Sequence, residues 1–276
     1  MMPSQGLTSD VAALYDGVAQ VVAATWGPDL HFGYWDDDND ASTVEEATNR
    51  LTDMVMEGVA PRPGQHILDI GCGIGNPAMR LLNAHKVSVH GITVSQVQVA
   101  EATARAGREG MSDRATFQYA DAADMPFVDA SFDAAWAIES MAHMDDCERM
   151  LSETARVLRP GGRLAIVDVI RRDPVAPERQ GDVDAICRLF ALHTLETVDR
   201  YEQWLKAQGF VDVRVRDIGD HVMPRTGMAM ARAVEAKRDE LVDLVGAEQA
   251  DALIAFMRTA SRTHEIGYIY ATAIRG

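Results

Sequence analysis

The sequence predicts an α/β fold built on a doubly wound, mostly parallel sheet, and three observations support that prediction. Short runs rich in β-forming residues alternate with helical stretches through the middle of the chain, as they do in βαβ units. Breaker segments stand at 61–64 and 159–162, before the first and fifth runs, where such a sheet needs loops. A glycine-rich segment directly follows the first run, at the edge where open α/β sheets bind ligands.

The expected elements follow one another in a regular order. Strands are expected at 66–70, 87–92, 115–119, 132–138 and 163–169, with helices between them at 76–84, 95–109 and 145–158. A helix at 201–208, a strand at 211–218, a long helical region at 226–259 and a last strand at 267–273 complete the pattern. The alternation of strand and helix periods therefore predicts a seven-stranded, Rossmann-like sheet.

Three segments lie outside this pattern, at 1–60, 172–200 and 222–262. We expect one domain, 1–276, in which these segments form a helical lid and substrate-binding layer around a core at 61–171, because ligands bind at the carboxyl ends of the strands. Methionines recur in and near these segments, at positions 141, 144, 223, 228, 230 and 257. Any single methionine is a typical core residue, but together they favour an adaptable pocket for an apolar acceptor.

The acidic run at 36–40 has two interpretations. A calcium-binding loop that begins at its first aspartate would need a glycine and a bidentate acid at the positions of Ala41 and Ala47. A solvated acidic loop that leads into a helix is therefore expected, with Ser42 and Glu45 at the spacing of a capping box.

Composition limits the partners of this protein. The 276 residues carry a formal net charge of -16, which argues against nucleic acid or an anionic membrane as the main partner, because both attract a basic face. Cys72, Cys147 and Cys187 lie far apart without a C-x-x-C pair, so neither a metal site nor a disulfide framework is expected. The first residues lack a signal-peptide pattern, and no apolar run of roughly 18 residues occurs. A cytoplasmic protein that acts on a small molecule is expected, and the sequence leaves its oligomeric state open.

The strongest local signal is a D-x-G-x-G-x-G segment formed by Asp69, Gly71, Gly73 and Gly75 between a strand and a helix. Glycines let the backbone turn sharply and approach a ligand, and the following helix presents free N–H groups. A dinucleotide site would need a third glycine at Asn76 and an acid after the second strand, and neither is present. The segment therefore predicts a site for a different ligand, unless it is only a tight turn.

This glycine segment, 69–75, resembles motif I of class I S-adenosylmethionine (SAM)-dependent methyltransferases, and further similarities follow in the order of that family. The similar segments are 91–98 (GITVSQVQ), 120–127, 132–144, 158–162 and the cofactor-covering segment 30–35 (LHFGYW). The likeness is greatest to small-molecule O-methyltransferases that act on sugars and macrolides in antibiotic biosynthesis. It implies the class I methyltransferase fold and SAM as the cofactor.

The resemblance also implies which residues hold the cofactor. They are Tyr34, Asp69, Gly71, Gly73, Gly75, Thr93, Gln98, Asp121 and Ala122. The carboxylate of Asp69 would meet the methionyl amino group, Gln98 the ribose hydroxyls and Asp121 the adenine amino group. Tyr34 would close over the cofactor. Asp121 is alternatively a simple turn acid, and Tyr34 a core aromatic residue.

Methyl transfer to an alcohol requires alignment of the nucleophile and removal of its proton. His143 lies just past the fourth strand and is the candidate general base. Asp168, at the end of the fifth strand, is its expected neighbour and would orient it or stabilise its charge. His143 is alternatively a structural histidine at a helix N-terminus. Ala142 departs from the family, because related O-methyltransferases often carry a second histidine there and cyclopropane synthases a glutamate.

Three functions remain open at this point. The leading one is a SAM-dependent methyltransferase that acts on a hydroxyl of a small, largely apolar secondary metabolite. The second is a SAM-binding cyclase on the same fold that transfers no methyl group, and Ala142 favours it. The third is a SAM-binding module without enzymatic activity, against which the long lid and His143 argue.

Overall fold

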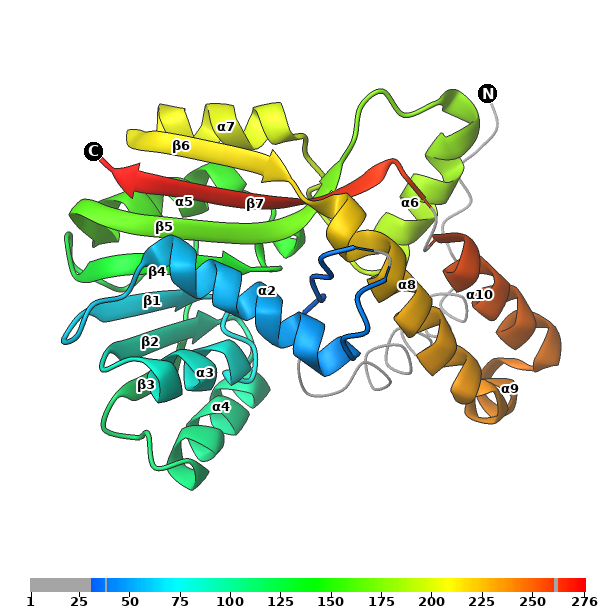
Figure 1. Ribbon diagram of the computed structural model, residues 1–276, viewed down its shortest axis with the longest axis horizontal. Coiled ribbons are helices and arrows are strands. Elements are labelled where there is room, and N and C mark those ends of the chain that lie inside the picture. Colours follow the sequence, from blue (N-terminus) through cyan, green and yellow to red (C-terminus); the bar gives the residue numbers. More distant parts are fainter. Residues whose placement is uncertain (1–30, 38, 261–262) are drawn as a thin grey trace.

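The computed structural model describes residues 31–37, 39–260 and 263–276. One seven-stranded sheet runs through these residues in the order β3-β2-β1-β4-β5-β7-β6. Helices cover both faces of the sheet, and a further group of helices lies beyond the ends of its strands (Figure 1). The expected doubly wound, mostly parallel α/β fold is therefore confirmed.

The central strands are parallel, and β7 runs antiparallel between β5 and β6. The strands are β1 (His66–Ile70), β2 (Ser88–Thr93), β3 (Ala115–Tyr119), β4 (Phe132–Ile138), β5 (Leu158–Arg171), β6 (Phe210–Asp217) and β7 (Ile266–Arg275). One expectation was wrong, because β5 begins at Leu158 and not at 163. Leu158 pairs with Phe132 beyond a register shift, so the expected turn at 159–162 lies within the strand.

The helices are α2 (Val44–Val59), α3 (Asn76–Ala84), α4 (Gln96–Arg108), α5 (Cys147–Val157), α6 (Gln180–Leu189), α7 (Val198–Ala207), α8 (Gly219–Ala236), α9 (Arg238–Val245) and α10 (Ala247–Ala260). The expected long helix at 226–259 is in fact three helices. The last break falls at Gly246, whose φ of +86° ends α9 in a conformation that favours glycine. Among the described residues, no helix is both long and apolar enough to cross a membrane.

The N-terminus of α2 corrects the predicted cap by one residue. Thr43, not Ser42, is the N-cap, and its hydroxyl accepts a hydrogen bond from Glu46 N at 3.2 Å. The Glu46 carboxylate in turn accepts from Thr43 N at 2.8 Å, which completes a capping box. Ser42 instead accepts a hydrogen bond from Arg50 at 2.9 Å, so the polar residue next to the true cap serves a tertiary contact.

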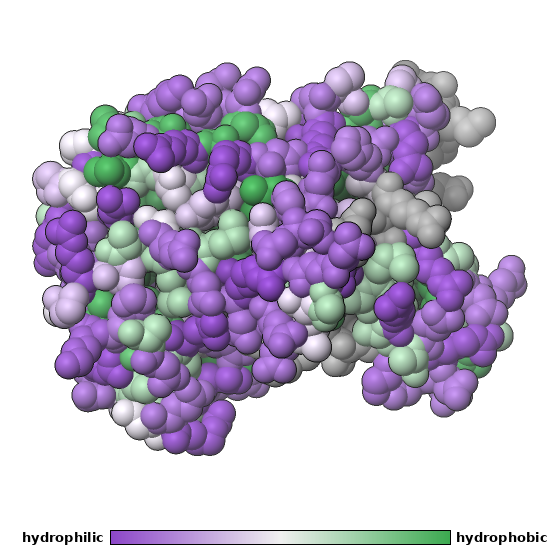
Figure 2. All heavy atoms as spheres, in the orientation of Figure 1, coloured by the Kyte–Doolittle hydropathy of each residue, from purple (hydrophilic) through white to green (hydrophobic). Residues whose placement is uncertain are grey.

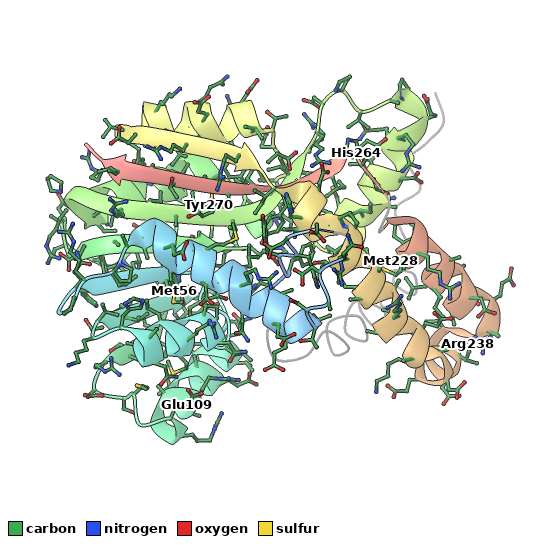
Figure 3. The ribbon with its side chains drawn as sticks, viewed as in Figure 1. Met56, Glu109, Met228, Arg238, His264 and Tyr270 are labelled. Carbon is green, nitrogen blue, oxygen red and sulfur yellow. The ribbon has the colours of Figure 1, made fainter. Side chains whose placement is uncertain are left out.

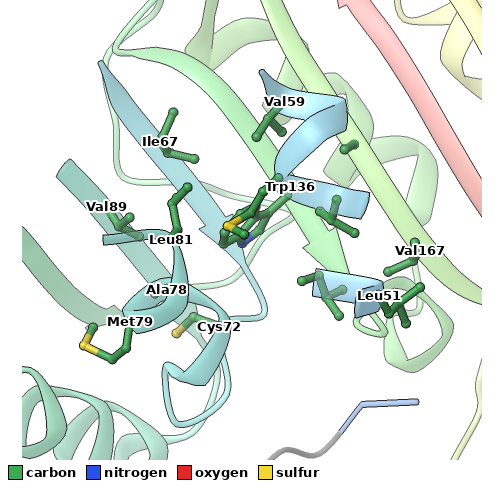
Figure 4. Close-up of a cluster of buried hydrophobic side chains, with 14 of the residues drawn as sticks. Leu51, Val59, Ile67, Cys72, Ala78, Met79, Leu81, Val89, Trp136 and Val167 are labelled. Atoms are coloured by element: carbon green, nitrogen blue, oxygen red, sulfur yellow. The ribbon is translucent and has the colours of Figure 1, made fainter. Parts of the chain in front are cut away.

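Two apolar clusters hold the helices to the two faces of the sheet. One joins α2, α3 and α4 to the sheet, and the other joins α5 and α7 to it. Trp136 of β4 is fully buried in the first cluster, where it lies near Ile67, Leu81 and Val59 (Figure 4). Helix α2 therefore belongs to the layer against the sheet, while residues 1–30 of the expected lid lie outside the described residues.

The helices beyond the strand ends have an apolar cluster of their own, which contains Leu189 of α6 and side chains of α8, α9 and α10. Met230 and Met257 are buried in this cluster, so these two methionines fill a core as any single methionine was expected to do. Met228 on α8 and Arg238 on α9 lie in this helical part, away from Met56 on α2 and Tyr270 on β7 (Figure 3). Hydrophilic residues cover most of the face drawn in Figure 2, as expected for a chain of net charge -16.

Candidate functional site

A cavity of about 330 Å³ lies at the carboxyl ends of the parallel strands. It brings together most of the residues predicted for the site, namely Asp69, Gly71, Gly73, Thr93, Gln98, Asp121, Ala122 and His143. Gly75, Tyr34 and Asp168 do not line it. The strand order places these residues together, because β1 lies between β2 and β4 and all three end at the same edge.

The three glycines after β1 share positive φ angles, of +73° at Gly71, +51° at Gly73 and +84° at Gly75, but their surroundings differ. A Cβ on Gly71 would lie 2.3 Å from Ser140 Cβ, and one on Gly75 would lie 3.1 Å from the Phe117 ring. These two glycines therefore permit close packing of the protein on itself. A Cβ on Gly73 would meet no atom within 4 Å, which leaves that position open to a ligand.

Asp69 carries a buried carboxyl group at the end of β1. Its side chain is only 2% exposed, and its Oδ2 atom has no hydrogen-bond partner among the described residues. Burial raises the pKa of Asp69 to about 7, because the charged form loses its hydration. An unsatisfied buried carboxylate fits a cationic amino group, which would supply both charge and hydrogen bonds.

Gln98 is held in place by its neighbours in the loop after β2. Thr93 Oγ1 donates a hydrogen bond to Gln98 Oε1 at 2.6 Å, and Ser95 Oγ accepts one from Gln98 N at 3.3 Å as the cap of α4. The carbonyl oxygen of the Gln98 amide is thus engaged by the protein. Its NH₂ group remains to donate to a ligand hydroxyl, so Thr93 acts through Gln98.

Asp121 has both features that the sequence left open. Its Oδ1 atom accepts a hydrogen bond from Ala123 N at 2.8 Å, which makes it a turn acid, and the residue also lines the cavity. Ala122 beside it is buried and lines the cavity too.

Tyr34 is placed differently from its expected position over a cofactor. Its ring stacks on His221 of α8 with centroids 5.0 Å apart, and its backbone N donates to Ala47 O at 3.0 Å. Within this segment His31, not Tyr34, lines the cavity. Tyr34 therefore connects α2 with α8, in keeping with the alternative of a packed aromatic residue.

His143 ends the short 3₁₀ helix η1 (Met141–His143) and is exposed toward the cavity. Its Nδ1 atom lies 3.0 Å from Ala191 O. A carbonyl oxygen only accepts hydrogen bonds, so Nδ1 carries a proton and the neutral ring has its lone pair on Nε2. This tautomer leaves Nε2 as the atom that can accept a proton.

Asp168 lies beneath η1 and is only 1% exposed. Its Oδ2 atom accepts hydrogen bonds from Met141 N at 2.8 Å and Ala142 N at 3.1 Å. Burial raises the pKa of Asp168 to about 6, while these backbone contacts and His143 oppose the rise. No hydrogen bond between Asp168 and the His143 ring is found in the described residues, so the carboxylate orients the turn rather than the imidazole.

Ala142 contributes to the core and not to the cavity. Its side chain is buried in the cluster that contains Trp136. Its carbonyl oxygen accepts hydrogen bonds from His193 N at 2.7 Å and Thr194 N at 3.0 Å. Together with Asp168 below, this second set of contacts fixes the turn that carries His143.

Glu139 also lines the cavity, although it was not among the site residues predicted from the sequence. Its carboxyl group accepts hydrogen bonds from Tyr268 Oη at 2.6 Å and Phe32 N at 2.7 Å. Burial raises its pKa to about 8. One signal was available in the sequence, because an acid that directly follows a buried strand stands at the ligand edge of such a sheet.

Comparison with known proteins identifies relatives of this chain. Residues 67–162 match the family model described as a methyltransferase domain. The 27-O-demethylrifamycin SV methyltransferase of Amycolatopsis mediterranei is 36% identical, over 96% of each chain. The O-methyltransferase resE of Aspergillus sclerotiorum is 37% identical, over 99% of this chain and 100% of its own. The crystal structure of the [4+2]-cyclase SpnF superposes with a TM-score of 0.76 at 31% identity, over 98% of this chain and 97% of its own.

Proposed function

We propose that this chain, which belongs to the class I SAM-dependent methyltransferases, methylates a hydroxyl group of a small, largely apolar secondary metabolite, with His143 as the general base. The chain is an enzyme of this family, and SAM is its cofactor. The observation that carries the proposal is the cavity, which is lined by an unsatisfied buried carboxylate, by an open glycine position and by a histidine whose Nδ1 is held by a carbonyl oxygen.

The described residues suit the separate parts of SAM. Asp69 would hold the methionyl ammonium group through its free Oδ2 atom, and the backbone at Gly73 would leave room for the ligand. Gln98 would donate to the ribose, and Asp121 and Ala122 would meet the adenine. The bound cofactor supplies an activated methyl group.

His143 would remove the proton of the acceptor hydroxyl. The carbonyl oxygen of Ala191 accepts a hydrogen bond from Nδ1–H, so Nε2 is the atom that would accept the proton. The imidazolium ring that results would keep its hydrogen bond to Ala191 O. Asp168 would act as a positioning residue, because it holds the backbone of the turn. A base placed in this way typically contributes about 10²–10⁴-fold to the rate.

We also propose that the segments at 172–200 and 222–262 form the acceptor side of one continuous domain. The apolar cluster of α8, α9 and α10 gives this part a core of its own, and Met144 and Met223 lie near the junction with the sheet. An apolar acceptor bound there would reach the carboxyl ends of the strands.

The test is incubation of the purified protein with SAM and candidate acceptors. The first acceptor is 27-O-demethylrifamycin SV, the compound in the name of the bacterial relative. We expect S-adenosylhomocysteine (SAH) and an acceptor heavier by one methylene unit, both measured by mass spectrometry. Acceptor-dependent conversion without any SAH would contradict the proposal.

A second function has a specific observation in its favour. The 31% identity to the SpnF cyclase extends over nearly the whole chain, so a cyclase that keeps SAM without consuming it is the alternative. Ala142 supports it less than the sequence suggested, since that side chain lies in the core. A cyclase would change the structure of its substrate but not its mass, and the same spectra separate the two functions.

A further inference from the structure

The residue after β4, Glu139, has a strained backbone at the edge of the cavity. Its φ angle is +46°, a left-handed conformation that is strained for a residue with a Cβ. The conformation is stabilised where surrounding contacts over-determine it. Here the contacts come from Tyr268 of β7 and from Phe32, whose rings stack with centroids 5.8 Å apart.

Both hydrogen bonds to the Glu139 carboxyl group end on the same oxygen. Tyr268 Oη and Phe32 N donate to Oε1 at 2.6 and 2.7 Å. The other oxygen, Oε2, has no hydrogen-bond partner among the described residues. A proton on this carboxyl group would therefore sit on Oε2, because Oε1 already faces two donors.

The surroundings favour the protonated form of Glu139 near neutral pH. Burial raises its pKa to about 8, and the charge of Asp168 on β5 adds to the rise, while the donors Tyr268 and Phe32 N oppose it. No lysine or arginine is among the described residues that line the cavity. The other titratable side chains that line it are His31, Asp69, Cys72, Asp121 and His143.

We propose that Glu139 binds the acceptor molecule as a hydrogen-bond donor, its Oε2–H meeting a carbonyl or ether oxygen next to the hydroxyl that is methylated. The position of that hydroxyl rests on the function proposed above. A carboxylic acid in an apolar site can stay neutral and donate in this way. The acceptor class is then a largely apolar molecule in which a carbonyl or ether oxygen neighbours the reactive hydroxyl, and Glu139 selects for that pair.

The protonation of Glu139 can be measured without an acceptor. Infrared difference spectra between wild type and Glu139→Gln should contain the C=O stretch of a protonated carboxyl group at neutral pH. This band should disappear as the pH rises through about 8. Tyr268→Phe removes a donor that stabilises the carboxylate, so it should move the midpoint to higher pH. A spectrum without a band that depends on Glu139 would overturn the proposal.

Binding of a probe then tests the donor itself. The probe is ortho-hydroxyacetophenone, which has a carbonyl beside a hydroxyl, and phenol is the control that lacks the carbonyl. On protein loaded with SAH, the affinity of wild type for the probe should fall about fivefold as the pH rises past the midpoint of the infrared titration. A fivefold loss corresponds to the typical contribution of one hydrogen bond. Affinity for phenol should not change.

Two variants of Glu139 should give opposite results depending on whether this residue donates a hydrogen bond to the probe or accepts one. Glu139→Gln should bind the probe as well as wild type does at neutral pH and show no pH dependence, because its amide also donates. Glu139→Leu should bind it about fivefold more weakly at every pH. If Glu139→Gln binds the probe as weakly as Glu139→Leu does, or if wild type binds the probe more tightly as the pH rises, then Glu139 acts as a carboxylate acceptor and the proposal is wrong. Failure of methyl transfer alone would overturn the proposed function and leave these binding results standing.

Discussion

Replacement of Gly73 by valine tests whether the loop after β1 holds the cofactor. A Cβ at Gly73 would have no atom within 4 Å, and Gly73 lines the cavity, so the valine side chain would begin in the space that a ligand needs. Forcing extra carbon atoms into a space that is filled when the ligand binds typically costs about 1–3 kcal/mol. The affinity for SAM should therefore fall roughly 5- to 150-fold.

Gly64 provides the matched control for this experiment. It also has a positive φ, of +83°, and a Cβ there meets nothing within 4 Å, but it lies in the turn before β1 and does not line the cavity. Both valine variants carry a similar backbone cost of at least about 1–2 kcal/mol and should lose similar thermal stability. Calorimetric titration with SAM and SAH then isolates the effect on the ligand. Equal SAM affinity in Gly73→Val and Gly64→Val would refute the reasoning and leave the loop as a simple turn.

Three further predictions concern the chemistry, the buried charge and the outer helices. His143→Ala should lower kcat by about 10²–10⁴-fold in the methyl-transfer assay while calorimetry shows nearly constant SAM affinity. A rate equal to that of wild type would show that His143 is not the general base. Asp69 has its pKa raised to about 7, so the folded protein without ligand holds a proton that the unfolded chain has lost, and its free energy of unfolding should fall as the pH rises from about 4 to about 7. Urea titrations at several pH values should show this fall in wild type and a smaller one in Asp69→Asn, and identical pH profiles would contradict the assignment. Amide hydrogen exchange in α8 and in residues 31–35 should slow when SAH is added, because the two pack together through Tyr34 and His221; unchanged exchange would count against a lid.

Much of the fold was predictable because it depends on local patterns. Buried parallel strands need continuous apolar runs, and the helices between them need a different period, so both are visible in the sequence. Element ends were less predictable, because they depend on side-chain contacts and strand pairing that form only in the fold. The cap of α2 moved from Ser42 to Thr43 because Arg50 engages the serine, and β5 was extended by pairing with Phe132.

The cofactor half of the site could also be predicted from the sequence. Asp69 at the end of β1 and Gly71 and Gly73 in the loop that follows lie within five residues of one another, so their spacing alone brings them together. Thr93 and Gln98 are likewise neighbours, and the observed hydrogen bond between them follows from that closeness. Local spacing was insufficient for Tyr34, because the packing of the segment on α8 decides which of its residues faces the cavity.

The sequence by itself thus determined the sheet, the glycine loop and the placement of the candidate base at a strand end. Only the tertiary structure decided which groups surround Asp168 and Glu139, and whether Ala142 faces the cavity or the core. The carboxylate of Asp168 accepts a hydrogen bond from the backbone of the turn that carries His143, and the side chain of Ala142 belongs to the core. One oxygen of the Glu139 carboxyl group accepts two hydrogen bonds. Each of these facts depends on groups that lie far away in the chain, such as Phe32 and Tyr268 around Glu139. Hydration and hydrogen bonding set the charge of a carboxyl group, and folding alone determines which neighbours provide them.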